Sequence, residues 1–229
     1  MEMLPSSHSK SFNSVTLLIT FLFIYYGIPQ IFFLLPISPT NEVITILLIF
    51  LPPLVLLGVI KILCGTIFIK WQNFLRLQYW ELIKTAFPNI LGALGVNVIW
   101  VILLTALGLT YETPAIETFL QNGSAAIIIS ISILAVIIAP VVEELTFREV
   151  IYSGIQEHAN EKWSMVITSL LFAVAHDEFW QIPGLFMLGY LFQRQKNHYK
   201  NIESAIFTHS FNNFLAMMLF FLAKFLIKS

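Results

Sequence analysis

Long apolar runs separated by short polar segments make up most of this chain of 229 residues. A helix needs about 20 apolar residues to cross the ~30 Å hydrocarbon core of a bilayer, because each residue rises by about 1.5 Å. The apolar runs cover residues 15–36, 43–69, 90–109, 125–142, 163–176, 182–192 and 202–227. The pattern predicts an all-α fold: a polytopic membrane helical bundle of about seven transmembrane helices.

Four stretches depart from a simple series of spans. Residues 15–36 are too long for the core of a signal peptide and lack a cleavage site, so we expect a retained span. Pro52–Pro53 predicts a kink in the second span. Residues 70–88 mix bases and aromatics at helical spacing, which favours an amphipathic helix on the membrane surface over an ordinary loop. Because the fifth and sixth segments are short, we expect the turn at Asp177–Glu178 inside the bilayer, buried by other helices.

The placement of Lys and Arg predicts the orientation in the membrane. If the spans alternate, most bases fall on one side, namely Lys10, Lys70, Arg76, Lys84, Arg148, Lys162, Arg194, Lys196 and Lys200. The loops on the opposite side, residues 37–42, 110–124 and 177–181, contain no Lys or Arg. We therefore predict a cytoplasmic N-terminus. Lys224 and Lys228 break this pattern, since seven crossings leave the C-terminus outside.

Composition supports the membrane assignment and excludes several other classes. The chain is 58% hydrophobic and 11% charged, whereas soluble domains carry roughly 25% charged residues. A net charge of −1 with scattered bases argues against a nucleic-acid partner. The single Cys64 excludes a disulfide framework within one chain. No linker divides the chain, so we expect one membrane domain: residues 1–124 form N-terminal spans and the interfacial helix, and residues 125–229 form a catalytic core.

Ionisable groups within the predicted spans are concentrated in the last four. Such groups are costly at membrane depth and are functional-site candidates by default. They form three clusters: Glu143, Glu144 and Arg148; Phe172 and His176; His209, Asn212 and Asn213. Glu144 and Arg148 are four residues apart and can form a local ion pair that supports the site. Glu143 points about 100° away and lacks that partner. A single such His or pair is more often structural, but three clusters together favour a site.

Their depths in the membrane are compatible. If the fourth and fifth segments form a hairpin turning near Asn160, Glu143 lies seventeen residues before the turn and His176 sixteen after it. His209 lies about 10 Å into a helix that begins near Ile202. We therefore expect Glu143, His176 and His209 to meet in one cavity that opens to the cytoplasm.

These side chains can support hydrolysis in two ways. In the first, Glu143 is a general base, His176 helps to hold and deprotonate a water, and His209 and Asn213 stabilise the oxyanion. In the second, Glu143, His176 and His209 ligate one divalent metal, such as zinc, that lowers the pKa of the water. The sequence leaves both mechanisms open, and no cofactor follows from it with certainty.

The three clusters resemble a known family. Glu143-Glu144-x-x-x-Arg148, Phe172-x-x-x-His176 and His209-x-x-x-Asn213, in that order, are similar to the three motifs of the CAAX-protease and bacteriocin-processing (CPBP, or ABI) intramembrane proteases. The resemblance covers roughly residues 125–227. It implies an all-helical membrane endopeptidase in which Glu143 and His176 activate water while His209 and Asn213 serve the oxyanion. Both a metal-dependent mechanism and a glutamate-dependent mechanism without a catalytic metal have been assigned to this family.

The short chain and compact loops resemble the prokaryotic branch, which implies a multi-pass protein of the bacterial plasma membrane. We expect an endopeptidase cutting a peptide or membrane-associated protein near the cytoplasmic face, in contact with the lipid bilayer. That branch is linked to peptide maturation, bacteriocin immunity, peptide export and the scaffolding of membrane kinases. The alternative is a non-proteolytic immunity or regulatory scaffold with the same fold. A proton-relaying transporter is a weaker third reading, because no interrupted helices occur in matching halves.

Overall fold

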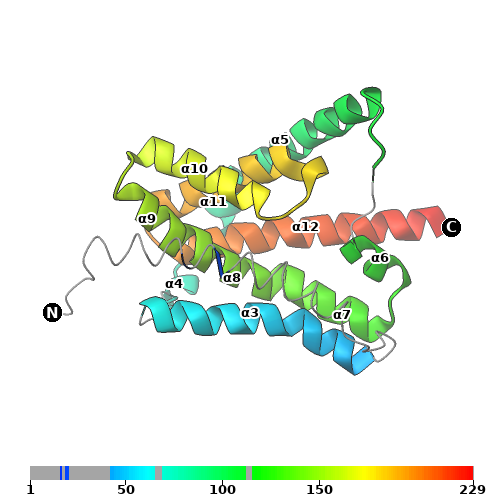
Figure 1. The fold of residues 1–229 in the computed structure, drawn as a ribbon, viewed down its shortest axis with the longest axis horizontal. Helices are drawn as coiled ribbons and strands as arrows, with labels where there is room; N and C mark the ends of the chain where they lie inside the picture. The colour runs from blue at the N-terminus through cyan, green and yellow to red at the C-terminus, as the bar shows by residue number, and fades with distance from the viewer. Residues whose placement is uncertain (1–15, 17–18, 21–41, 65–68, 112–114, 229) are drawn as a thin grey trace.

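The structure is a computed structural model that describes residues 16, 19–20, 42–64, 69–111 and 115–228. Within these ranges every regular element is helical, which confirms the all-α fold (Figure 1). The elements are α3 (Glu42–Cys64), α4 (Trp71–Phe74), α5 (Tyr79–Ala106), α6 (Ala115–Asn122), α7 (Ala125–Ile133), η2 (Leu134–Ile138), α8 (Ala139–Glu144), η3 (Leu145–Ile151), α9 (Tyr152–Gln156), α10 (Glu161–Val174), η4 (Phe179–Gln181), α11 (Ile182–Tyr199) and α12 (Ile202–Lys228).

Four helical stretches in the described ranges are long and apolar enough to cross a membrane. They are Glu42–Ile62, Tyr79–Ala106, Ala125–Gln156 and Ile202–Leu226. Their outer faces carry exposed large apolar side chains, including Leu47, Leu54, Ile99, Ile102, Ile137, Leu222 and Phe225. A water-soluble surface does not carry so many, so these faces suit lipid. The chain is therefore a multi-pass membrane protein.

The predicted count of about seven spans stays a prediction. The first expected span, residues 15–36, lies almost wholly outside the described residues. The fifth and sixth segments correspond to α10 and α11. These form helices, but neither has the length and apolar character of the four spans.

The stretch expected to be one interfacial helix, residues 70–88, is divided in the structure. Only the single turn α4 is separate, and the chain from Tyr79 onward belongs to α5. α5 continues through Pro88 to Ala106, so its first ten residues are an extension of the third span. The surface-helix prediction was therefore wrong for residues 79–88. α3 remains helical through Pro52–Pro53, and the kink expected there stays a prediction.

Residues 125–156 form one continuous rod in which α7, α8 and α9 are joined by η2 and η3 (Figure 1). α3 runs beside this rod, and α12 packs along its other side. After the rod the chain reverses at Asn160, whose side chain accepts the Trp163 backbone N–H and so caps α10. The predicted hairpin near Asn160 is thereby confirmed.

α10, α11 and α5 form the remaining layer, and two glycines allow their close approach. A Cβ at Gly184 of α11 would lie 3.2 Å from the Ala93 carbonyl oxygen of α5. A Cβ at Gly189 would lie 3.1 Å from Phe172 Cδ1 of α10. The buried core lies where these helices meet the rod and the start of α12. It includes Leu56, Ile60, Val142, Leu145, Phe147, Phe172, Leu191, Phe192, Ala205 and Ile206.

Candidate active site

Glu143 and Glu144 end the short helix α8, at a buried position within the rod. Glu143 is 7% exposed and Glu144 is fully buried. The segments on either side, η2 and η3, are π-helical. In η2 the N–H of Ala139 bonds the carbonyl of Leu134, five residues back, and in η3 the N–H of Tyr152 bonds that of Phe147. Such wide turns are rare in proteins, and those that do occur are often found at functional sites.

Glu144 is the centre of a buried ionic network. Arg148 Nε lies 2.9 Å from Glu144 Oε2, so the predicted ion pair is present. His209 Nδ1 lies 2.9 Å from Glu144 Oε1. Both oxygens of this carboxylate are therefore occupied, which leaves Glu144 to support the site rather than to accept a proton from water.

The Arg148 guanidinium is fully buried among aromatic rings. Its Cζ lies 4.8 Å from the centre of the Phe172 ring and 6.0 Å from those of Phe147 and Phe192. Its two terminal nitrogens have no hydrogen-bond partner among the described residues. The cation is held by one carboxylate and by ring faces, so removing either partner leaves a poorly compensated buried charge.

His176 faces Glu143 across a short gap. Its Nδ1 lies 2.7 Å from the carbonyl oxygen of Phe172, which can only accept, so we assign the proton to Nδ1. In the neutral ring Nε2 then carries a lone pair, and it lies 3.4 Å from Glu143 Oε2. With the ring neutral, two acceptors face one another, and Glu143 Oε2 has no hydrogen-bond partner among the described residues. This arrangement suits a group that brings its own hydrogens, such as water.

His209 completes the group. Its Nε2 lies 3.9 Å from Glu143 Oε2. The ring stacks on Phe192 with centroids 4.5 Å apart and planes at 16°. The side chains of Glu143, His176 and His209 are 10%, 24% and 5% exposed, so His176 is the most accessible side. The structure therefore brings together these three residues from α8, the end of α10 and α12.

Asn213 lies one turn after His209 but is directed to the backbone of η2. Its Nδ2 donates to the Ala135 carbonyl at 2.8 Å, and its Oδ1 accepts from Asn212 Nδ2 at 2.9 Å. One N–H of the carboxamide is therefore engaged, and the other is left for a further acceptor. Asn212 orients this amide, a relation that the spacing of the motif does not predict.

The donor types of Glu143, His176 and His209 suit a divalent metal such as zinc, and each His has its Nδ1 held by an acceptor. Metal–ligand bonds of about 2.0–2.1 Å place tetrahedral ligand atoms about 3.4 Å apart. Glu143 Oε2 and His176 Nε2 have this spacing, at 3.4 Å, whereas His209 Nε2 is 3.9 Å from Glu143 Oε2. Among the described residues, no three His, Cys, Asp or Glu side chains form a group that could hold a metal ion. The steps below therefore use the chain's own side chains.

Two residues at the site were missed from the sequence. Phe192, which stacks on His209, was only the end of an apolar run. Lys196 entered only the Lys and Arg distribution that predicts the membrane orientation, yet its Nζ lies 2.5 Å from the Arg148 carbonyl oxygen. The sequence feature that could have indicated Lys196 is its position one helical turn after Phe192, on the same face of the helix.

Comparison with known proteins agrees with the three motifs. Residues 124–215 match the family model for Rce1-like proteins, described as type II CAAX prenyl endopeptidase Rce1-like. The matched range contains every residue of the site described above. No curated protein and no solved structure matches the chain significantly. The resemblance is thus confirmed, and the match indicates an enzyme of the CAAX-protease type.

Proposed function

We propose that this chain, whose residues 124–215 match the family model for type II CAAX prenyl endopeptidase Rce1-like proteins, hydrolyses a peptide bond within the membrane near its cytoplasmic face. One observation carries the proposal. Glu143 Oε2 and His176 Nε2, an acceptor when the ring is neutral, face each other at 3.4 Å beside a third ionisable side chain, His209. A water that donates one hydrogen to each acceptor is held and polarised for attack.

Glu143 is the general base of the reaction. As the water oxygen attacks the carbonyl carbon of the scissile bond, one water proton passes to Glu143 Oε2 and a tetrahedral oxyanion forms. Glu143 then transfers this proton to the leaving nitrogen as the C–N bond breaks. The products are a new carboxyl terminus and a new amine, and Glu143 returns to the carboxylate. His176 Nε2 accepts a hydrogen bond from the second hydrogen of the water, which orients the attacking oxygen, and that hydrogen stays on the new carboxyl group.

His209 and Asn213 stabilise the oxyanion. His209 donates from Nδ1 to Glu144, so donation from Nε2 as well requires the imidazolium, whose charge Glu144 balances. Asn213 has one N–H engaged with Ala135 and offers the other. Removing one donor of such a site commonly lowers kcat by about 10²–10³.

The substrate we propose is a peptide or a membrane-associated protein that approaches from the lipid bilayer, in the plasma membrane of a bacterium. His176 is the most exposed of the three central side chains, so the substrate enters from its side. A membrane kinase or a peptide exporter is a proposed partner of the same protein. The N-terminus is proposed to be cytoplasmic, as the distribution of Lys and Arg predicts.

The decisive experiment measures cleavage of a quenched peptide library by purified, detergent-solubilised protein. Glu143→Gln keeps the shape and removes the base, so we expect cleavage to be lost. Glu157→Gln, outside the network, is the matched control and should retain activity. Activity that survives a chelator supports the general-base route, and chelator-sensitive activity that zinc restores supports the metal route. Cleavage that Glu143→Gln leaves intact would overturn the proposal. Complementation of a cellular phenotype by Glu143→Gln would favour the non-proteolytic scaffold.

A further inference from the structure

The two π-helical segments share one feature that the proposed mechanism does not use. In an α-helix the N–H of Tyr152 would bond the Arg148 carbonyl, four residues back. It bonds Phe147 instead, and the Arg148 carbonyl accepts from Lys196 Nζ of α11 at 2.5 Å. A side chain from another helix thus takes the acceptor that the wide turn releases.

The same exchange occurs on the other side of Glu143 and Glu144. The N–H of Ala139 bonds Leu134 rather than Ala135, four residues back. The Ala135 carbonyl accepts from Asn213 Nδ2 of α12 at 2.8 Å. Both wide turns are therefore closed from outside the rod, and the short helix α8 lies between them.

Further contacts hold the Lys196 side chain in this position. Its Nζ also lies 3.1 Å from Glu149 Oε1 and 5.8 Å from the centre of the Tyr152 ring. Its side chain is 16% exposed, well below that of a typical surface lysine. Glu149 lies within η3 and Tyr152 directly follows it, so three contacts hold one ammonium group against this turn.

We propose that Lys196 is a positioning residue for the hydrolysis, because it holds η3 in the π-helical form that sets the directions of Glu144 and Arg148. A π-turn contains one extra residue, and its loss would rotate the two ends of the rod by about 100° relative to each other. The hairpin at Asn160 fixes the C-terminal end, so the rotation would move Glu144 away from His209. This inference rests on the proposed function and adds to it a residue outside the three motifs.

Lys196→Met removes the donor and keeps the aliphatic length, while Lys196→Arg restores a charged donor. Lys162→Met, an exposed lysine in the first turn of α10, is the matched control. We expect Lys196→Met to lower kcat by at least about 100-fold with KM within twofold, because even a misplacement of reacting groups by about 1 Å can cost about 100-fold. Lys196→Arg should recover most of kcat, and Lys162→Met should match the wild type.

A second measurement does not depend on proteolysis. With ¹⁵N-labelled histidine, the His209 ring signals are assigned by their loss in His209→Gln. We expect them to shift in Lys196→Met and to stay in place in Lys162→Met. If the wild type shows no Glu143-dependent cleavage, the proposed function fails and this spectrum still tests the position of η3. Unchanged His209 signals in Lys196→Met overturn the inference, as does an equal loss of kcat and thermal stability in both Lys196 variants.

Discussion

Glu144 Oε1 and His209 Nδ1 lie 2.9 Å apart, although 65 positions separate the two residues in sequence. The contact joins the first motif, on the rod, to the third motif, on α12. It also distinguishes the roles of the two neighbouring carboxylates, Glu143 and Glu144. Glu144 has both oxygens occupied by Arg148 and His209, while Glu143 keeps an oxygen that faces His176. One Glu is thus suited to orient and the other to react.

Replacing Glu144 by Gln should damage both stability and activity. The change leaves the buried Arg148 without its counter-charge and His209 without a carboxylate. Breaking a buried pair in this way destabilises proteins by about 3–5 kcal/mol, and we expect kcat to fall by at least about 100-fold. Thermal unfolding in detergent and peptide cleavage measure the two effects. Glu157→Gln is the control, and a stable, active Glu144→Gln would contradict the role assigned to this carboxylate.

Gly189 sets the distance between α11 and α10 at the site. An added Cβ would lie 3.1 Å from Phe172 Cδ1 and 3.3 Å from Ser169 Cα, closer than ordinary van der Waals contact. Phe172 supplies both the carbonyl that orients His176 and the ring beneath Arg148. Gly189→Ala should therefore lower the free energy of unfolding by about 1–3 kcal/mol and reduce kcat.

The control for this substitution is Gly95→Ala in α5. A Cβ there meets nothing within 4 Å, and Ala favours a helix interior over Gly by up to about 1 kcal/mol. Gly95→Ala should be neutral or stabilising in the same thermal assay. If the two variants behaved alike, the close packing against Phe172 would have no energetic weight.

Helix periodicity and length arithmetic predicted the meeting of Glu143, His176 and His209. The prediction needed only the turn at Asn160 and the start of α12 near Ile202, and the structure has both. The arithmetic could not predict η2 and η3, because it assumes regular α-helices of about 3.6 residues per turn. The contacts that Lys196 and Asn213 make to the carbonyls of these turns come from helices distant in sequence. The sequence did not reveal that α5 continues through Pro88, because a proline usually kinks or ends a helix.

Glu203, at the start of α12, anchors α4 to the bundle. Its carboxylate accepts from the Lys70 backbone N–H at 2.6 Å and from Asn73 Nδ2 at 3.1 Å. Glu203→Gln removes the negative charge that strengthens both hydrogen bonds and replaces one acceptor oxygen by a donor. We expect faster hydrogen exchange in the segment around Trp71–Phe74, with Glu157→Gln unchanged. Equal exchange in wild type and Glu203→Gln would show that α4 is held by other contacts.

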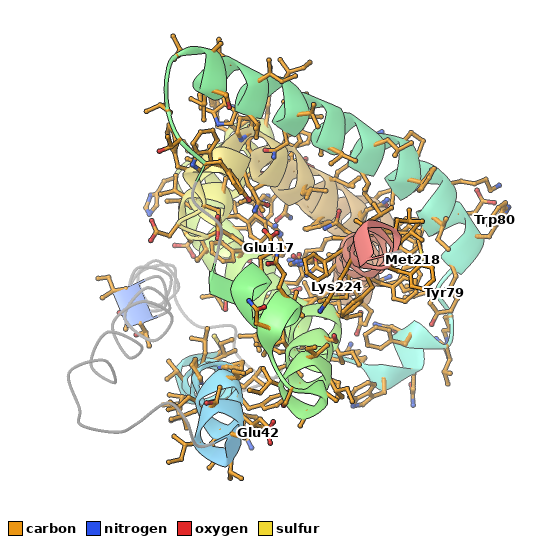
Figure 2. All side chains as sticks on the ribbon, turned by 90° about the vertical axis from the view of Figure 1, so that its right-hand side faces the viewer. Glu42, Tyr79, Trp80, Glu117, Met218 and Lys224 are labelled. Carbon is orange, nitrogen blue, oxygen red and sulfur yellow. The ribbon has the colours of Figure 1, made fainter. Side chains whose placement is uncertain are left out.

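Lys224 explains one of the two exceptions to the predicted charge asymmetry. Its Nζ lies 2.9 Å from the carbonyl oxygens of both Leu120 and Gln121, in the last turn of the short helix α6. Figure 2 shows Lys224 beside this helix. A cation at a helix C-terminus satisfies carbonyls that lack partners within the helix. Lys224→Met should cost about 1 kcal/mol locally and speed hydrogen exchange in α6, while kcat stays unchanged. Lys224→Arg should retain most of the protection, and a Met variant with native exchange would contradict this role.

The alkaline limb of the activity profile should report on Lys196. Burial lowers the pKa of the Lys196 ammonium from its ordinary value of about 10.4, while the charge of Glu149 opposes the shift and Arg148 adds to it. The ammonium therefore loses its proton earlier than an exposed lysine does. Its attraction to Glu149 then disappears, and kcat should fall with rising pH. In Lys196→Arg the guanidinium stays protonated, so this limb should move to higher pH.

Stability should respond in the opposite direction. Between the lowered pKa of Lys196 and the ordinary lysine value, the unfolded chain binds more protons than the folded one. The free energy of unfolding therefore rises with pH in this window, because the cost of burying the charge disappears. As the pH rises through this window, the kcat of the wild type should fall while the contribution of Lys196 to the free energy of unfolding rises. The difference in the free energy of unfolding between the wild type and Lys196→Arg isolates that contribution. If both proteins lost activity at the same pH, another group would set the alkaline limb.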